Sequence, residues 1–480
     1  MSADPTCSPP QNTATSTPPR GWLERRRLLA ARRIIEELGR ALDARFSVRL
    51  WDGSSVPLGR SVDPEYYLEV SSAEVIGSLL RRPNLATLLD HYAQGRIDIK
   101  GGSLISFVEL ARSNGSKLRW RDLNKALLFR EALALLTAGS ASPGPRSTHS
   151  APRSDREAIR FHYDLSNEFY ALFLDPEMQY SCAYFRDWEN SLEQAQQDKL
   201  DITCRRLRLK PAERLLDVGC GWGGLICHAA KHFGVLAHGV TLSQAQYEFA
   251  TEKIRREGLV GRASVELADY REIQGEYDKI VSIEMFEHVG IANYPIFFGK
   301  LYSLLPDRGV LVIQGSARRA KKSQRAFRRM RPERRFILDQ VFPNGELDHI
   351  GHTLSAMEVQ GFEVHDVEAW RDHFARTMRV WSERLWENRE RAIELVGSES
   401  LRVWLVYLTG VSFAYRDGSV RVYQVMATKH ATKGASRQGP GRQDLYTGWW
   451  QIDRQEADPR LIVTPEAHQS LESGLSTGTR

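Results

Sequence analysis

The chain has 480 residues, of which 42% are hydrophobic and 26% are charged. This is ordinary globular composition; it excludes a mainly disordered chain, and the length predicts two or three domains. Five cysteines without a C-x-x-C pair indicate neither a disulfide framework nor a metal site, and we expect a reduced, cytoplasmic protein. The longest nearly apolar run, residues 403–415, is too short to cross a bilayer.

Positive charge is concentrated in one segment. Residues 318–335 contain ten Lys or Arg and one acid, Glu333, which gives this segment a net charge of +9 in a chain whose net charge is +6. The rest of the chain therefore carries −3. A local basic segment predicts either an anionic partner or a solvated loop, and both nucleic acid and anionic lipid fit this pattern.

The first part of the chain is predicted to form a small α+β domain, residues 21–138. Residues 1–20 are rich in Ser, Thr and Pro, lack the apolar core of a secretory signal, and are expected to form a disordered tail. Residues 21–46 have the spacing of a basic amphipathic helix, and residues 46–51 alternate like a strand. Residues 139–154, rich in Ser, Pro and Gly, are a predicted linker.

The second part, residues 155–435, alternates predicted strands and helices. This order favours an α/β domain with a mostly parallel sheet covered on both faces. The interval 332–400 is predicted to be a helical insertion that forms a lid, and residues 436–480 are a C-terminal extension. The predicted strands are residues 214–218, 235–240, 263–267, 279–283 and 309–314, with an edge strand at 419–426.

A glycine-rich turn follows the first of these strands. The sequence LLDVGCGWGG at 215–224 runs from an apolar strand into Gly219, Gly221 and Gly223, which permit a sharp turn and a close approach of the backbone to a ligand. The spacing G-x-G-x-G after Asp217 differs from the dinucleotide pattern G-x-G-x-x-G and is typical of S-adenosylmethionine (SAM) sites. A tight turn without a ligand is the alternative.

Polar residues after the next three predicted strands support a ligand site. Because the carboxyl ends of parallel strands meet at one edge, we expect these residues to lie together and to bind SAM. The candidates are Thr241, Leu242, Ser243 and Gln246; Asp269, Tyr270 and Arg271; and Ile283.

Four blocks of sequence carry a resemblance to a known family. HYDLSNEFY at 162–170, YSCAYF at 180–185, GVTLS at 239–243 and MFEHVG at 285–290 resemble the cyclopropane-fatty-acyl-phospholipid synthases, with the mycolic acid cyclopropane synthases. The resemblance implies a seven-stranded Rossmann-like class I SAM-dependent methyltransferase sheet with a helical lid, preceded by a small α+β accessory domain that binds lipid. It also implies that Tyr180 and Ser181 contact SAM.

The resemblance further implies methyl transfer from SAM to a cis double bond of a phospholipid acyl chain. The product would be a cyclopropane fatty acid formed through a carbocation, which aromatic faces such as those of Tyr163 and Tyr184 stabilise. Phe169, Tyr170 and Phe286 are further aromatic candidates. A bicarbonate ion held by Cys182, Glu287 and Gln314, or Glu287 itself, would be the base.

Three positions depart from the family pattern. Gln314 stands where the family has His, Phe374 where it has Tyr, and Val411 where it has Cys. Each lost donor weakens the predicted bicarbonate site. Three outcomes therefore stay open: ring closure, a methylene- or methyl-branched product, and a non-catalytic relative that binds SAM and lipid. Glu284 and His288 are expected to be structural.

The basic segment now favours lipid over nucleic acid. Together with the basic residues between Arg25 and Arg33, it predicts peripheral binding to an anionic membrane surface at the inner leaflet. Nucleic acid is not expected as a partner, and a homodimer is left open.

Overall fold

The computed structural model describes residues 21–113, 123–136, 166–330, 335, 338, 341–342, 345–431, 433–436, 438 and 441–446. The predicted tail, the predicted linker and Tyr163 lie outside the described residues, as do most of the C-terminal extension and parts of residues 331–344. The chain divides into two compact units, 1–435 and 436–480. Within the second unit, the described residues include one short helix, α17 (Gln443–Tyr446).

The N-terminal part combines helices with a four-stranded sheet in the order β2-β1-β3-β4. The long helix α1 buries one apolar stripe, which includes Ala30 and Ile34, and the fully buried carboxylate of Glu131 on α5 pairs with Arg26 and Arg33 of α1 at 2.5 and 3.0 Å. The elements are α1 (Trp22–Leu42), β1 (Ser47–Arg49), β2 (Ser55–Pro57), β3 (Tyr67–Val70), α2 (Ala73–Arg81), α3 (Leu85–Ala93), β4 (Ile97–Lys100), α4 (Leu104–Ser113) and α5 (Lys125–Leu136).

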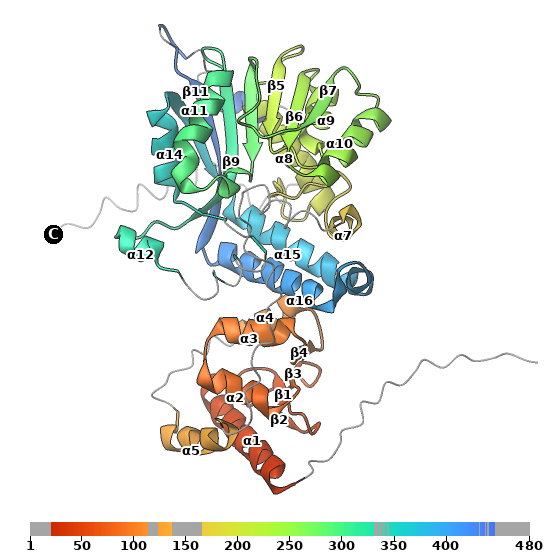
Figure 1. Cartoon of the computed structure of the whole chain (residues 1–480), viewed down its shortest axis with the longest axis vertical. Helices are drawn as coiled ribbons and strands as arrows, with labels where there is room; N and C mark the ends of the chain where they lie inside the picture. The colour runs from red at the N-terminus through yellow and green to blue at the C-terminus, as the bar shows by residue number, and fades with distance from the viewer. Residues whose placement is uncertain are drawn as a thin grey trace, which may run out of the picture. The chain divides into compact units, whose positions relative to one another are not determined.

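The second sheet has seven strands in the order β10-β11-β9-β8-β5-β6-β7 (Figure 1). Strands β9, β8, β5, β6 and β7 pair in parallel, whereas β11 is antiparallel to both of its neighbours. This architecture confirms the predicted fold class. The strands are β5 (Arg214–Val218), β6 (Leu236–Thr241), β7 (Ala263–Leu267), β8 (Lys279–Ile283), β9 (Val310–Arg318), β10 (Phe362–Ala369) and β11 (Val420–Lys429).

Two predictions about this sheet were wrong. The interval 332–400 is not wholly helical, because it contains β10, and the strand predicted at 419–426 is not at the edge, because β11 lies between β10 and β9. Alternation of polar and apolar residues reports which faces of a strand are buried, not which strands flank it. The charged residues of β10, such as Glu363 and Asp366, also made its sequence resemble that of a polar helix.

Helices cover both faces of the large sheet. Neighbouring residues of one strand enter different cores: Leu215 packs with residues of α8 and α9, and Leu216 packs with residues of α11. The elements are α7 (Asn167–Ala171), α8 (Leu192–Arg206), α9 (Gly224–His232), α10 (Gln244–Arg256), η2 (Phe286–His288), η3 (Ile291–Asn293), α11 (Tyr294–Leu304), α12 (Gln324–Arg328), α14 (Ile350–Val359), α15 (Arg371–Glu387) and α16 (Arg389–Arg416).

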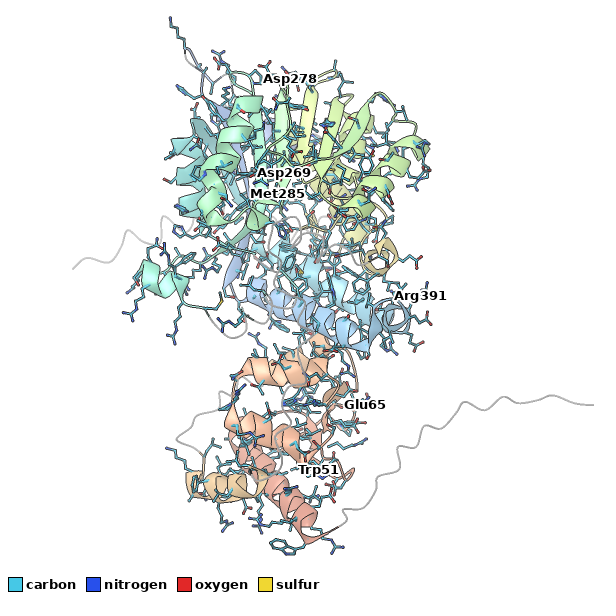
Figure 2. All side chains as sticks on the ribbon, in the orientation of Figure 1. Trp51, Glu65, Asp269, Asp278, Met285 and Arg391 are labelled. Carbon is cyan, nitrogen blue, oxygen red and sulfur yellow. The ribbon has the colours of Figure 1, made fainter. Side chains whose placement is uncertain are left out.

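The two ends of β8 mark the amino and carboxyl ends of the parallel strands of the sheet. Figure 2 shows Asp278, which precedes β8, at one end, and Met285, which follows β8, near Asp269 at the other. The loops that follow the parallel strands therefore gather at the carboxyl ends of these strands, where Met285 lies. No helix within the described residues is long and apolar enough to span a membrane.

Candidate functional site

The turn between β5 and α9 uses its glycines for two purposes. Gly219, Gly221 and Gly223 have φ angles of 88°, 53° and 81°. A Cβ atom on Gly219 would lie 2.7 Å from the side chain of Met285, and one on Gly223 would lie 2.9 Å from Ala250, so these glycines permit close packing. A Cβ atom on Gly221 would have no described neighbour within 4 Å. Gly221 therefore faces open space.

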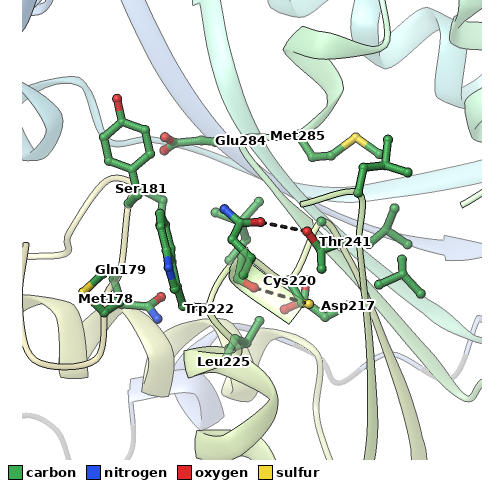
Figure 3. A pocket seen from close by; sticks show the side chains of 18 of the residues that line it. Met178, Gln179, Ser181, Asp217, Cys220, Trp222, Leu225, Thr241, Glu284 and Met285 are labelled. Atoms are coloured by element: carbon green, nitrogen blue, oxygen red, sulfur yellow. Dashed lines mark hydrogen bonds between the residues drawn. The ribbon is translucent and has the colours of Figure 1, made fainter. Parts of the chain in front are cut away.

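That space is a pocket at the carboxyl ends of the parallel strands (Figure 3). Of the predicted cofactor residues, the lining includes Tyr180, Ser181, Asp217, Gly219, Gly221, Thr241, Leu242, Gln246, Tyr270 and Ile283. The other four do not line it. Gly223 is the N-cap of α9, the Ser243 hydroxyl accepts from the backbone N–H of Gln246 at 3.4 Å, and Asp269 pairs with Arg271 at 2.6 Å.

Asp217 places a buried acid in the pocket wall. It is 3% exposed, and burial raises the pKa of its carboxyl to about 7, an effect that Lys199 opposes. Across the pocket wall, the Thr241 hydroxyl donates to Oε1 of Gln246 at 2.7 Å. The pocket thus offers a buried carboxyl and neutral polar groups.

Lys199 is a pocket residue that sequence reasoning missed. It lies on α8, is fully buried, and its Nζ atom lies 2.5 Å from Oε1 of Gln179 and 3.0 Å from Oγ of Ser181. Burial lowers the pKa of this ammonium group to about 8. On the same helix, Gln196 donates to the carbonyls of residues 179 and 181. Helix α8 therefore holds the 179–181 segment against the pocket, and nothing in the local sequence marks this role.

Glu284, which the sequence suggested to be structural, also lines the pocket. It follows β8 with a φ of 52°, a backbone conformation that is uncommon outside glycine. Its Oε1 atom accepts the backbone N–H of Cys182 and the side-chain amide of Gln314, both at 2.9 Å. The amide of Gln424 donates to Oε1 of Gln314 at 3.0 Å and so fixes the orientation in which Gln314 is a donor. Burial and the nearby Glu287 raise the pKa of Glu284 to about 8.

The predicted pair Cys182 and Glu287 lies beside Glu284 but does not line the pocket. The Cys182 thiol is fully buried and donates to the carbonyls of Ala183 and Trp370, and burial raises its pKa well above the usual value. Its backbone N–H, not its sulfur, reaches Glu284. Oε1 of Glu287 accepts the Ser316 N–H at 2.6 Å, and burial raises the pKa of Glu287 to about 7.

The aromatic candidates are divided between the pocket and the core. Tyr180 and Trp222 line the pocket, and Tyr170 packs on both, with ring centroids 5.4 and 5.0 Å away. Tyr184 instead stacks on His373, and Phe286 is buried in the core against the sheet. Tyr180 and Trp222 therefore line the pocket together with Tyr270, while Tyr163 lies outside the described residues.

The pocket residues fit SAM. A cationic cosubstrate would offset the cost of an ionised Asp217 in this buried position. The open space at Gly221 admits a ligand against the backbone, and the polar side chains of Thr241 and Gln246 can exchange hydrogen bonds with it.

Comparison with known proteins identifies the family. The family model described as mycolic acid cyclopropane synthetase matches residues 150–425. A probable fatty acid methyltransferase of Pseudomonas putida is 36% identical over 403 residues, which cover 83% of this chain and 95% of that protein. A probable fatty acid methyltransferase of Mycobacterium tuberculosis is 39% identical over 287 residues, covering 60% and 65%.

Solved structures agree with this assignment. The mycolic acid cyclopropane synthase CmaA1 in complex with SAH and CTAB is 33% identical and has a TM-score of 0.54, over 58% of this chain and 99% of that chain. The cyclopropane synthase MmaA2 of Mycobacterium tuberculosis is 31% identical with a TM-score of 0.54, over 58% and 100%. The chain therefore belongs to the mycolic acid cyclopropane synthetase family of SAM-dependent methyltransferases, and it is an enzyme that modifies lipid acyl chains with SAM as its cosubstrate.

Proposed function

We propose that the enzyme methylates cis double bonds in the acyl chains of phospholipids and closes a cyclopropane ring, with Glu284 as the proton acceptor. The observation that carries this proposal is the position of the Glu284 carboxylate. It lines the pocket, is bound by two N–H donors at 2.9 Å, and has a pKa raised to about 8. A raised pKa makes an ionised carboxylate a stronger base.

The reaction needs no base for its first step. The π electrons of the double bond attack the methyl carbon of the cosubstrate, the C–S bond breaks with its electrons on sulfur, and the acyl chain is left with a carbocation. Glu284 then removes one proton from the transferred methyl group, and the electrons of that C–H bond form the last C–C bond of the ring. The rings of Tyr180 and Trp222 can stabilise the cation through their faces and exclude water.

The groups expected to hold bicarbonate are already engaged. The Cys182 N–H and the Gln314 amide both donate to Glu284, and the Cys182 thiol donates to backbone carbonyls. These residues do not fit a free bicarbonate ion, so no step is assigned to one. The Glu284 carboxylate accepts from the donors that a bicarbonate ion would need.

A methylene-branched product is the second candidate. It arises if a hydride shifts along the acyl chain before the proton leaves the transferred methyl group, so that the same base completes a C=C bond instead of a ring. The name of the Pseudomonas putida relative, a probable fatty acid methyltransferase aligned over 95% of its length, favours this alternative. A base that is already fixed beside the pocket favours ring closure, because it can take the proton before the shift.

We also propose that the substrate lies in an anionic membrane. The described part of the basic segment supports this: Arg319, Lys321, Lys322, Arg325, Arg328 and Arg329 are exposed around the short helix α12. Each basic side chain near an anionic surface contributes about 1 kcal/mol of attraction. Figure 1 shows α12 below the large sheet, on the side toward which β9 runs.

The test is mass spectrometry of acyl chains after incubation of the full-length protein with SAM and vesicles of a cis-unsaturated anionic phospholipid. A gain of one CH2 that resists hydrogenation identifies the ring. The same gain that hydrogenates to a methyl-branched chain identifies the methylene product. Vesicles of saturated lipid are the control, and an absence of any mass gain on unsaturated lipid contradicts the proposal.

A further inference from the structure

The hydroxyl group of Tyr415 interacts electrostatically with the two carboxylates of the site, Glu284 and Glu287. Tyr415, on α16, is 2% exposed, and its ring stacks on that of Phe374, on α15, with centroids 4.6 Å apart and planes at 30°. Position 374 is where the family resemblance implies a tyrosine. In this chain the stacked pair keeps one hydroxyl group, and that group belongs to Tyr415.

A short chain of hydrogen bonds connects this hydroxyl to Glu287. The Oη atom of Tyr415 lies 2.7 Å from Oγ of Ser316 on β9. Ser316 in turn donates its backbone N–H to Oε1 of Glu287 at 2.6 Å, and the backbone and side chain of Ser316 both oppose the rise that burial causes in the pKa of Glu287. The hydrogen bond from Tyr415 therefore fixes the side chain of the residue whose backbone N–H holds Glu287.

Strand β9 thus holds both carboxylates, one through a side-chain amide and the other through a backbone N–H. Gln314 and Ser316 are two residues apart on β9, so their side chains project to the same side of the sheet. Gln314 donates to Glu284, and Ser316 donates to Glu287. The two carboxylates also interact with each other, and the charge of Glu287 therefore raises the pKa of Glu284.

We propose that Tyr415 is a positioning residue for methyl transfer: acting through Ser316, its hydroxyl keeps Glu287 ionised and turned toward β9, and the charge of Glu287 makes Glu284 a stronger base. The role assigned to Glu284 rests on the proposed function. The hydrogen-bonded connection from Tyr415 to Glu287 does not, and it can be tested without turnover.

Other titratable groups also interact with these three residues. Among the described residues they include Lys199, Cys182, Tyr294, Tyr407 and Glu346, and His288 lines the pocket with Glu284. Burial lowers the pKa of His288 to about 4 and raises that of Cys182 well above its usual value, so neither changes charge near neutral pH. Lys199, with a pKa lowered to about 8, titrates in the same range, and the variants below leave it in place.

The variant Tyr415→Phe keeps the ring and its stack on Phe374 but removes the hydroxyl. Infrared difference titration, with the Glu287 band identified by subtraction of Glu287→Gln, should show the Glu287 midpoint rising by about half to one pH unit. This is a three- to tenfold change in its ionisation constant. Ser316→Ala should shift the midpoint in the same direction, and the double variant should show less than the sum of the two shifts.

Activity provides the second readout. In Tyr415→Phe, the midpoint of the rate–pH curve should move to lower pH and the plateau rate should fall roughly three- to tenfold, because a less ionised Glu287 leaves Glu284 a weaker base. Tyr302→Phe, on α11 with its ring against Phe362, is the matched control and should behave as wild type.

The outcomes separate the inference from the function on which it rests. A wild-type Glu287 midpoint in Tyr415→Phe overturns the inference, whether or not the enzyme turns over, because a ring that only packs against Phe374 would leave the midpoint unchanged. A wild-type protein that makes no product on unsaturated vesicles contradicts the proposed function instead, and the infrared titration still decides the connection to Tyr415.

Discussion

The side-chain amide of Gln314 donates to the carboxylate of Glu284 across 2.9 Å, from the middle of the sheet to the loop that follows β8. Gln424 on β11 orients this amide, so the donor direction is set by a strand that lies far away in sequence. The arrangement gives the pocket a partly buried, hydrogen-bonded carboxylate. A second carboxylate, Glu287, interacts with it, and the pKa of Glu284 is raised to about 8.

Replacing this carboxylate should stop the reaction without preventing cosubstrate binding. Glu284→Gln keeps the shape and one acceptor oxygen but cannot take a proton, so methyl transfer from radiolabelled SAM to lipid should fall by about 10²- to 10⁴-fold. Calorimetric affinity for SAM should change little. A variant that retains the wild-type rate would show that another group is the base.

The rate of the wild-type enzyme should depend on pH in a defined direction. The proposed reaction needs ionised Glu284, whose pKa is raised to about 8, so the single-turnover rate should rise with pH up to about 8 and level off above it. The measurement is quenched-flow turnover on vesicles from pH 6 to 9.5, with vesicle integrity checked at each pH. A rate that is flat across this range would argue against a carboxylate base with this pKa.

The same raised pKa values predict a stability cost at high pH. Glu284 and Glu287 have pKa values raised in the folded state to about 8 and about 7, so the stability that they contribute is present below their unfolded values and is lost as pH rises through the folded ones. At pH 9, Glu284→Gln removes a buried charge and should raise Tm by a few degrees relative to wild type. At pH 5 this gain should disappear. Thermal unfolding monitored by circular dichroism checks both points, and a gain at pH 5 as large as at pH 9 would contradict the sign.

Asp217 should link SAM binding to pH. Burial raises the pKa of its carboxyl to about 7, and only the ionised form attracts a cationic ligand, so SAM affinity should increase between pH 6 and pH 8 with release of a proton. Isothermal titration calorimetry in two buffers with different ionisation enthalpies measures that proton. Asp217→Asn should weaken binding by about tenfold at pH 8 and remove the pH dependence. The exposed Asp307→Asn serves as a control, and a persistent pH dependence in Asp217→Asn would assign the proton to another group.

The two glycines of the turn should respond differently to alanine. Gly219→Ala places a Cβ atom 2.7 Å from Met285 and should destabilise the fold by roughly 1–3 kcal/mol. Gly221→Ala places its Cβ atom in the open pocket, so it should cost only about 1 kcal/mol of stability while lowering SAM affinity by tenfold or more. Thermal unfolding without ligand and calorimetric binding separate the effects. An unchanged SAM affinity in Gly221→Ala would mean that Gly221 does not face the ligand.

Much of the fold was predictable from sequence because the signals are local. An apolar run that enters a glycine turn identifies a strand, a turn and a helix within ten residues, as at Asp217 and Gly219. The strands β5 to β9 were predicted to within a few residues for the same reason. Strand β10 and the central place of β11 were not, because polarity patterns describe the faces of a strand and carry no information about its lateral partners.

The sequence alone determined the fold class, the family and the cosubstrate, because strand patterns, a glycine turn and short contiguous blocks of residues carry them. Only the tertiary structure decided the chemistry of the site. Cys182 meets Glu284 across 102 positions of sequence, and Ser316 meets Tyr415 across 99. Such contacts depend on strand order and on how α16 packs against the sheet, and no local periodicity encodes either. That is why Glu284 and Tyr415, which sequence reasoning left out of the site, are brought into it by the fold.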